Sequence, residues 1–319
     1  MNRFPGLALR CSNWARRLKW IPPDKFRAMP ASPQAQTGAV PTIVILGHPV
    51  HHSVSPAMQG AAFAALGLPH RVMAVDVPPA ELPAAIARFR SGEWAGGNVT
   101  IPHKRAVLAL LDEVTDTAAL LGAANTIINR GGRLVGDNTD AAGFIADLDT
   151  HAVDLRGEPV LVFGTGGSAR AVAYALLQRG AAEVRLLGRN IPQGAQLARE
   201  LHAVTGGRLI NFAWTPTDVG DASHGCVLVV NCTPLGMTPD IHTTPWFQVV
   251  PFSSKPFVYD LVYNPAQTLL LRQALSHGLR GATGLGMLVQ QGALAFQRWT
   301  GSAAPVDIMR AAAEAKLYA

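Results

Sequence analysis

Residues 159–178 read PVLVFGTGGSARAVAYALLQ, and the order of residue types in this stretch decides the fold. An apolar run (159–163) leads directly into a glycine-rich turn (164–169), which opens a stretch of helix-forming residues. In a dinucleotide-binding strand–turn–helix unit, the first glycine permits a tight turn, the second lets the backbone approach a pyrophosphate, and a small third residue lets the helix pack closely on the strand. The N–H groups and the dipole at the helix start then attract the phosphates. The predicted phosphate-binding residues are Gly164, Thr165, Gly166, Gly167, Ser168 and Ala169.

The second strand of this unit predicts which dinucleotide binds. An NAD-preferring site usually carries an acid about 20 residues after the turn, where it holds the ribose 2′-hydroxyl. Here the strand at 183–187 is followed by Gly188, Arg189 and Asn190. A guanidinium fits the 2′-phosphate of NADP, whereas a solvated arginine without a ligand is the simpler alternative. Because the acid is missing, we predict NADP, bound in part by these three residues.

Strand and helix patterns alternate on both sides of the turn. Short apolar runs alternating with helical spacing indicate an α/β fold with parallel sheets covered on both faces. The predicted strands are 42–46, 71–77, 97–101, 159–163, 183–187, 227–230 and 257–261, and the predicted helices include 56–66, 79–91, 102–111, 168–178 and 193–202.

The glycine-rich turn lies in the middle of the chain, so a Rossmann domain is expected after an earlier α/β domain. The boundaries predicted from the sequence are 1–40 for an unstructured or mis-assigned extension, 41–140 for a mainly parallel substrate-binding domain, and 141–283 for the Rossmann domain. Residues 284–319 show helical patterns without a strand, and we expect these helices to return to the substrate domain.

The charge of the chain is unevenly distributed. The 319 residues carry 27 Lys plus Arg and 21 Asp plus Glu, a formal net charge of +6. Residues 1–40 hold seven basic residues against Asp24 alone, so the remainder is formally neutral and nucleic-acid binding loses its main support. The extension is either an organellar leader or a start-site artefact, with translation beginning at Met29.

Other function classes lack support in the sequence. No apolar run approaches the ~18 residues of a membrane helix. Cys11, Cys226 and Cys232 have no zinc-ligand spacing, so we expect no metal and a reducing cytoplasm.

Polar residues concentrate in four short segments outside the turn, at 52–56, 98–104, 124–126 and 138–140. Ser55 before Pro56 is explained by helix capping, but Ser53 is not. Lys104 is predicted in the first turn of a helix opening at Pro102, where the dipole would lower its pKa. A lysine of lowered pKa near a carboxylate such as Asp140 is a plausible proton-transfer pair for interconverting an alcohol and a ketone beside a nicotinamide.

From about Ile43 to its C-terminus the chain resembles the shikimate dehydrogenase family. Eight motifs occur in the family's order, which makes the resemblance far more specific than any one of them. They are GHPVHHSVSPAM (47–58), GGNVTIPHK (96–104), GAANTI (122–127), GDNTDAAGF (136–144), GTGGSARA (164–171), VNCTPLGM (230–237), YDLVYNP (259–265) and GLGMLVQQGALAFQRWTG (284–301).

The resemblance implies an oxidoreductase that reversibly reduces 3-dehydroshikimate to shikimate with NADPH, in chorismate and aromatic amino-acid biosynthesis. Lys104 would be the essential acid/base, and Asp140 would pair with it across the reacting hydroxyl. Of the other implied substrate-binding residues, Ser53, Ser55 and Tyr263 would hold the carboxylate, and Thr100, Asn125 and Gln291 the ring hydroxyls. Thr233, Met237, Leu261 and Gly284 would flank the cofactor, with Met287 and Leu288 either beside the nicotinamide or in the core.

The sequence departs from the family near the predicted 2′-phosphate site. Gly188 stands where asparagine is common, and Gln193 stands where a second basic residue often occurs. Arg189 would therefore act alone in binding the 2′-phosphate.

Three alternatives stay open. A quinate or quinate/shikimate dehydrogenase with broader substrate or NAD use would share the fold and the Lys104–Asp140 pair. A catalytically silent NADP-binding module predicts loss of that pair, yet both residues are present. Nucleic-acid binding would need the basic N-terminus to be translated and retained. The expected partners are small molecules only, without nucleic acid or membrane, and the chain is expected to be a monomer or a homodimer.

Overall fold

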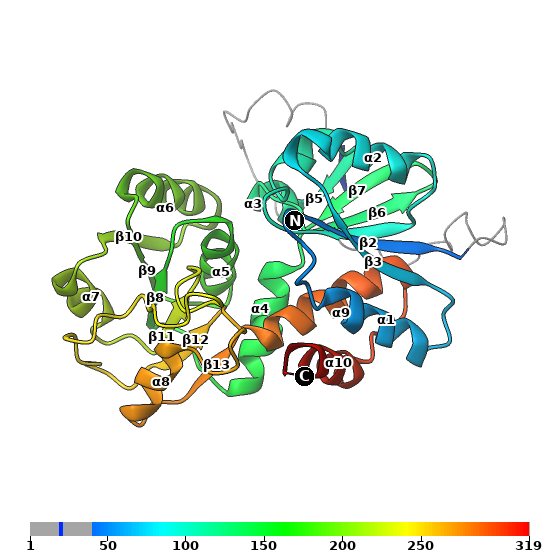
Figure 1. Cartoon of the computed structure of the whole chain (residues 1–319). Helices are drawn as coiled ribbons and strands as arrows, with labels where there is room; N and C mark the ends of the chain where they lie inside the picture. Colours follow the sequence, from blue (N-terminus) through cyan, green and yellow to red (C-terminus); the bar gives the residue numbers. More distant parts are fainter. Residues whose placement is uncertain (1–18, 22–39, 319) are drawn as a thin grey trace. The chain divides into compact units, whose positions relative to one another are not determined.

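The computed structural model describes residues 19–21 and 40–318, which belong to two compact units, each with its own sheet (Figure 1). The first unit comprises Met73–Asn138 and the described residues up to His51. The second comprises His52–Val72 and the described chain from Thr139 onward.

The sheet of the first unit has seven strands in the order β1-β5-β7-β6-β4-β2-β3. Strand β6 runs antiparallel to both of its neighbours, β4 and β7, whereas the β2–β4, β5–β7 and β1–β5 pairs are parallel. The predicted mainly parallel α/β fold is thus confirmed. The strands are β1 (Lys19–Ile21), β2 (Thr42–Gly47), β3 (Arg71–Asp76), β4 (Gly96–Val99), β5 (Glu113–Thr115), β6 (Thr126–Arg130) and β7 (Arg133–Asp137).

Helices and short 3-10 turns complete the first unit. Its largest buried side chains include Trp94 and Phe89, whose rings meet edge to face with centroids 5.0 Å apart. The buried face of α2, which includes Phe89, therefore packs into the core of this unit. The elements are η3 (Pro79–Glu81), α2 (Leu82–Arg90), η4 (Ala106–Leu110) and α3 (Asp116–Leu121).

The predicted helix over 102–111 is wrong. A turn spans residues 101–105, and only the 3-10 helix η4 follows it. Tertiary hydrogen bonds compete with helical ones here, because the Lys104 carbonyl accepts from the Ala124 N–H at 2.8 Å. The His103 ring, through Nε2, also donates to the Val77 carbonyl at 2.7 Å. These contacts fix the segment as a loop.

The N-terminal extension differs from expectation at three residues. Lys19–Ile21 forms β1, which pairs in parallel with β5 from Lys19 opposite Glu113 to Ile21 opposite Thr115. The expectation of an unstructured extension therefore does not hold for this strand. The rest of the segment lies outside the described residues.

The sheet of the second unit has six strands in the order β10-β9-β8-β11-β12-β13, and all neighbours are parallel. Chain order reverses beside β8, which is the arrangement of a Rossmann sheet. The strands are β8 (Pro159–Phe163), β9 (Glu183–Gly188), β10 (Arg208–Ala213), β11 (Leu228–Asn231), β12 (Phe257–Asp260) and β13 (Gly281–Thr283).

The helical elements of the second unit are α1 (Ser55–Ala65), α4 (Asp140–Leu148), η5 (Asp149–His151), α5 (Gly167–Gln178), α6 (Ile191–Thr205), α7 (Pro216–Ser223), α8 (Leu269–Ser276), α9 (Leu285–Thr300) and α10 (Val306–Tyr318).

The C-terminal helices pack on α1, which the sequence assigned to the substrate domain. Gln59 of α1 donates through Nε2 to the Gly292 carbonyl of α9 at 2.9 Å. The rings of Phe63 and Phe296 are in contact at a tilt, with centroids 4.7 Å apart. Within the described residues these three helices share a unit with the Rossmann sheet, so the domain boundaries of the sequence analysis stay a prediction.

A buried hydrogen bond joins α4 to the Rossmann sheet. The Tyr259 hydroxyl donates to Asp147 Oδ2 at 2.7 Å, and both residues are almost completely buried. Burial and the neighbouring carboxylate raise the pKa of Tyr259 well above its ordinary value, so this hydroxyl stays protonated. The bond therefore offsets part of the cost of burying the Asp147 charge.

We expect Tyr259→Phe to lower the free energy of unfolding by about 1.5–3 kcal/mol, the range for a hydrogen bond to a charged group. Urea unfolding measures this change. The exposed Tyr318 offers a matched control, and Tyr318→Phe should change the value by less than about 0.5 kcal/mol. Equal effects of the two substitutions would contradict the role given to Tyr259.

Candidate functional site

The glycine-rich turn lies between β8 and α5, as predicted. Gly164 has φ 109°, a left-handed conformation that favours glycine. Gly166 is the N-cap of α5 and supplies no side-chain cap. The neighbouring helices α6, α7 and α8 are each capped by a side chain, from Asn190, Thr215 and Thr268. The first N–H groups of α5 therefore depend on solvent or a ligand for acceptors.

The space beside Gly166 and Gly167 is open. A Cβ added to Gly166 or Gly167 would meet no atom within 4 Å, and neither residue has a positive φ. The fold of the chain by itself therefore does not require glycine at either position. By contrast, Ala169 is fully buried where α5 packs on the sheet. Exposed backbone without side chains at a helix N-terminus is what close approach of a phosphate needs.

The predicted 2′-phosphate segment follows β9. Gly188 ends this strand, and the Arg189 side chain is exposed directly after it. Asn190 caps α6 by accepting the Gln193 N–H at Oδ1, 3.0 Å away. Gln193 in turn accepts from the Thr165 hydroxyl at 3.3 Å. Asn190 and Gln193 thus have structural contacts, and Arg189 is the cation that the segment presents.

The other predicted cofactor residues lie at the same edge of the sheet. Thr233, Leu261 and Gly284 follow the carboxyl ends of β11, β12 and β13, where open α/β sheets bind ligands. A Cβ on Gly284 would stand 2.2 Å from the Leu261 carbonyl oxygen, so this close approach requires glycine. Met237 is exposed, whereas Met287 is buried in α9.

Three predicted substrate residues belong to the first unit. The Thr100 N–H donates to the Leu46 carbonyl at 2.8 Å, and the Val99 N–H donates to the Asn125 carbonyl at 2.8 Å. The buried Asn125 also accepts from the Thr126 hydroxyl at 2.9 Å. Thr100 and Asn125 are therefore held at the ends of β4 and β6.

Lys104, the third of them, lies in the turn after β4 and is partly buried. Because residues 101–105 form a turn, Lys104 does not lie in the first turn of a helix as predicted, and no helix dipole acts on it. Its backbone carbonyl is nevertheless fixed by Ala124, which anchors the residue beside Asn125.

The remaining substrate residues belong to the second unit. Ser55 is the first residue of α1, preceded by Val54 as N-cap, so the capping role expected for Ser55 is wrong. The Ser53 hydroxyl accepts from the Ser55 N–H at 3.3 Å. Asp140 is the buried first residue of α4, a position where the helix dipole favours a carboxylate.

Gln291 and Tyr263 complete this group. Gln291 of α9 donates through Nε2 to the Leu288 carbonyl at 2.7 Å. Tyr263 follows β12 and is partly buried, and burial raises the pKa of its hydroxyl. The hydroxyl therefore stays a hydrogen-bond donor at neutral pH.

Sequence reasoning missed two residues beneath the predicted cofactor loops, Asn231 and Asp260. They are the last residues of β11 and β12, directly opposite each other, and both are fully buried. The Asn231 amide donates to Asp260 Oδ1 at 2.8 Å. The signal that could have found them is a polar residue closing an apolar strand in VVN and FVYD.

Burial raises the pKa of Asp260 to about 6, against hydrogen bonds from Thr268, Val262 and Asn231 that lower it. Since this value lies above the ordinary one, the folded chain binds more protons, and stability falls as the pH rises from about 4 to about 6. We expect the unfolding free energy of Asp260→Asn, relative to that of the unaltered protein, to increase by about 1.4 kcal/mol for each pH unit between about 4 and about 6. Urea unfolding at several pH values measures the difference. A difference independent of pH would contradict the ionisation of Asp260.

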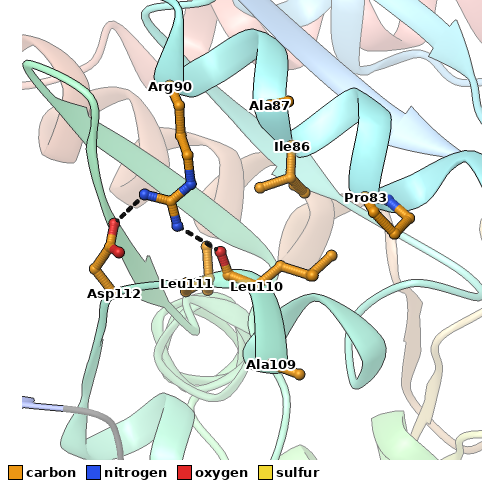
Figure 2. Close-up of a pocket in the computed structure, with 8 residues that line it drawn as sticks. All are labelled: Pro83, Ile86, Ala87, Arg90, Ala109, Leu110, Leu111 and Asp112. Carbon is orange, nitrogen blue, oxygen red and sulfur yellow. Dashed lines mark hydrogen bonds and ion pairs between the residues drawn. The ribbon is translucent and has the colours of Figure 1, made fainter.

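A pocket of about 370 Å³ in the first unit contains none of the predicted site residues (Figure 2). The Arg90 guanidinium crosses it, bonded to Asp112 at 2.7 Å and to the Leu110 carbonyl at 2.9 Å. These bonds link α2 to the segment before β5, so the pocket's main polar group has a structural role.

Two further searches cover only the part of the chain that the structure describes. No helix there is both long and apolar enough to cross a membrane. No group of three or more His, Cys, Asp or Glu side chains there could hold a metal ion.

Fold and site together define a two-unit α/β protein with a dinucleotide-binding sheet, the architecture of a nicotinamide-dependent oxidoreductase. Two family models match the chain: the shikimate dehydrogenase substrate binding domain at residues 45–127 and the shikimate 5'-dehydrogenase C-terminal domain at residues 284–314. The chain belongs to the shikimate dehydrogenase family.

Individual relatives agree with this assignment. The shikimate dehydrogenase (NADP(+)) of Symbiobacterium thermophilum is 48% identical over 86% of this chain and 93% of that protein. A crystal structure of shikimate 5-dehydrogenase from Thermus thermophilus, in complex with NADP(H) and shikimate, has a TM-score of 0.79 at 38% identity and covers 87% of this chain and 100% of its own. A quinate dehydrogenase from Corynebacterium glutamicum in complex with NAD also has a TM-score of 0.79, at 29% identity, over 86% of this chain and 98% of its own.

Proposed function

We propose that this protein is an NADP-dependent shikimate dehydrogenase, which reversibly reduces 3-dehydroshikimate to shikimate in chorismate and aromatic amino-acid biosynthesis. The observation that carries the proposal is the 48% identity to a protein of that name, over nearly the full length of both. Four of the eight motifs fall inside residues 45–127 and 284–314, which the two family models match. The α5 N-terminus, which has no side-chain cap, supports a phosphate site at the glycine-rich turn.

Lys104 acts as the general acid and base in this proposal. It supplies the proton to the carbonyl oxygen during reduction and removes it from the hydroxyl during oxidation. Asp140 binds the same hydroxyl of the substrate. Asp140 is held for this role as the first residue of α4.

Neutral hydrogen-bond donors and acceptors recognise the rest of the substrate. Ser53, Ser55 and Tyr263 hold its carboxylate, for which the protonated Tyr263 hydroxyl is a suitable donor. Thr100, Asn125 and Gln291 bind ring hydroxyls. Each of these groups left unpaired by a wrong substrate would carry a free-energy penalty, which gives specificity.

The NADP assignment is supported by the fit of the turn and of Arg189. The α5 N-terminus and the open space beside Gly166 and Gly167 suit the pyrophosphate. Arg189 suits the 2′-phosphate, since no carboxylate stands beside it to repel that group. When bound, the cofactor supplies the hydride, and the protein orients it.

We expect Arg189→Ala to weaken NADP binding by about 10- to 100-fold, the loss of a charge-assisted contact of about 1.5–3 kcal/mol. NAD binding should change less than about threefold, because the 2′-phosphate is the only group that distinguishes the two cofactors. Separate dissociation constants for NADPH and NADH test this. An equal loss for both would remove Arg189 from the 2′-phosphate site.

Identification of the product tests the proposed reaction. Purified protein incubated with shikimate and NADP should form 3-dehydroshikimate and NADPH in equal amounts, as followed by NMR and absorbance. No product from the folded protein would overturn the proposal. Formation of 3-dehydroquinate from quinate at a comparable rate would favour the quinate/shikimate alternative instead.

Location and assembly follow from the cysteines and from the sequence analysis. We propose the cytoplasm, since Cys226 and Cys232, the cysteines within the described residues, are free thiols. Monomer or homodimer stays the prediction for assembly.

A further inference from the structure

The loops after β11 and β12 share one buried hydrogen-bonded junction. Asp260 Oδ1 accepts from Asn231 Nδ2 at 2.8 Å and from the Val262 N–H at 3.0 Å, and Oδ2 accepts from the Thr268 hydroxyl at 2.6 Å. Val262 and Thr268 lie near the two ends of the loop that contains Leu261 and Tyr263. One carboxylate therefore closes that loop from beneath.

Asn231 extends the same junction to the other loop. Its Oδ1 accepts from the Thr233 N–H at 2.9 Å and from the Thr233 hydroxyl at 2.7 Å. Its backbone carbonyl accepts from the Leu261 N–H at 2.9 Å. The Asn231 amide thus donates to Asp260 and, at 3.2 Å, to the Leu235 carbonyl, and it accepts from Thr233, which fixes the orientation of both loops at once.

Because these groups are buried, each of their donors and acceptors must have a hydrogen-bond partner within the protein. Asn231, Asp260 and Thr268 are each 0% exposed, so an unmet donor or acceptor has no water to replace its partner. A buried carboxylate is also costly unless its hydrogen bonds are made. A valine or threonine at the end of β12 would fill the same space without this cost. The buried Asp260 carboxylate is therefore better explained by the loops that it holds than by packing.

We propose that Asp260 and Asn231 are positioning residues for cofactor binding, which hold Thr233 and Leu261 in the geometry that NADP requires. The proposal rests on the proposed function, because Thr233 and Leu261 are assigned to the cofactor there. Neither Asp260 nor Asn231 touches the cofactor; both act through the loops above them.

Asn231→Asp is the most informative single change. It preserves shape and the acceptor for Thr233, but it sets a second carboxylate against Asp260. We expect the dissociation constant of NADPH, measured by fluorescence titration, to rise at least about tenfold. Asp260→Asn should have a milder effect, about two- to fivefold, because the Thr268 hydroxyl can reverse its bond and accept from the new amide.

In the double variant Asn231→Asp with Asp260→Asn, the new amide nitrogen at position 260 can donate to the new carboxylate at position 231, which restores the central bond with its direction reversed. The amide oxygen then still accepts from the Thr268 hydroxyl, while the Val262 N–H loses its acceptor. We expect it to bind NADPH more tightly than Asn231→Asp alone, which is the non-additivity of a direct pair. A merely structural role would not produce this rescue of affinity. If Asn231→Asp does not fold, the double variant carries the test by itself: it should fold and bind NADPH, and a folded double variant without NADPH affinity would count against the inference.

Asn129→Asp provides a matched control in the first unit. Asn129 also holds a loop, since its Nδ2 donates to the Trp94 carbonyl at 2.9 Å and its Oδ1 accepts from the Gly132 N–H at 2.8 Å. This variant should lose thermal stability and still bind NADPH as the unaltered protein does.

Three results would overturn the inference: NADPH affinity unchanged in Asn231→Asp, a double variant that binds NADPH no better than Asn231→Asp, or an equal loss of affinity in the Asn129→Asp control. Failure of the proposed function is a separate result, because it would appear in the unaltered protein as absence of NADPH binding or of shikimate turnover.

Discussion

We expect Lys104→Ala to lower kcat for shikimate oxidation by about 100- to 10,000-fold, the usual contribution of a positioned general acid or base. The hydride step then lacks a group to take the hydroxyl proton. The dissociation constant of NADPH should stay within about twofold, because the cofactor-binding turn and loops belong to the second unit. Steady-state kinetics with both substrates and a fluorescence titration measure the two effects.

Lys316 offers the matched control for this substitution. It is an exposed lysine in the last turn of α10, and Lys316→Ala should leave kcat unchanged. Turnover by Lys104→Ala within about tenfold of the unaltered protein would remove Lys104 from the mechanism. A loss of NADPH affinity equal to the loss of kcat would instead point to a disturbed fold.

Asp140→Asn should lower kcat by about 100-fold or more, with a smaller rise in KM for shikimate. The amide preserves the size of the side chain and one acceptor oxygen, but it lacks the negative charge that the proposed mechanism assigns to this position. The loss should therefore fall mainly on the chemical step. Measuring kcat and KM separately tests this division.

Asp307→Asn is a close control, since Asp307 is also an acid in the first turn of a helix, but an exposed one. It should leave both constants unchanged. If Asp140→Asn raised KM and left kcat intact, Asp140 would be a binding residue and would have no part in proton transfer.

The Rossmann sheet could be predicted from the sequence because local and tertiary signals agree there. The apolar run at 159–163 is a central strand, and the glycines after it have the geometry of a tight turn. Strands of mixed polarity gave a weaker signal. β6 and β7 were missed because their apolar and polar residues match neither a buried parallel strand nor a helix.

The segment around Lys104 could not be predicted from local propensity. Its residues suit a helix, yet the bonds from Ala124 to the Lys104 carbonyl and from His103 to Val77 connect it to distant parts of the first unit. Such contacts have no signature in the segment itself. The junction of Asn231 with Asp260 was missed for the same reason, since only strand pairing places the two residues opposite each other.

The central claim is tested most directly by kcat/KM for shikimate and for quinate, each measured with NADP and with NAD on the unaltered protein. The account predicts the highest value for shikimate with NADP, at least about tenfold above each of the other three combinations. Equal or higher values with quinate or NAD would assign the protein to the broader quinate/shikimate class, and no turnover in any combination would contradict the catalytic account altogether.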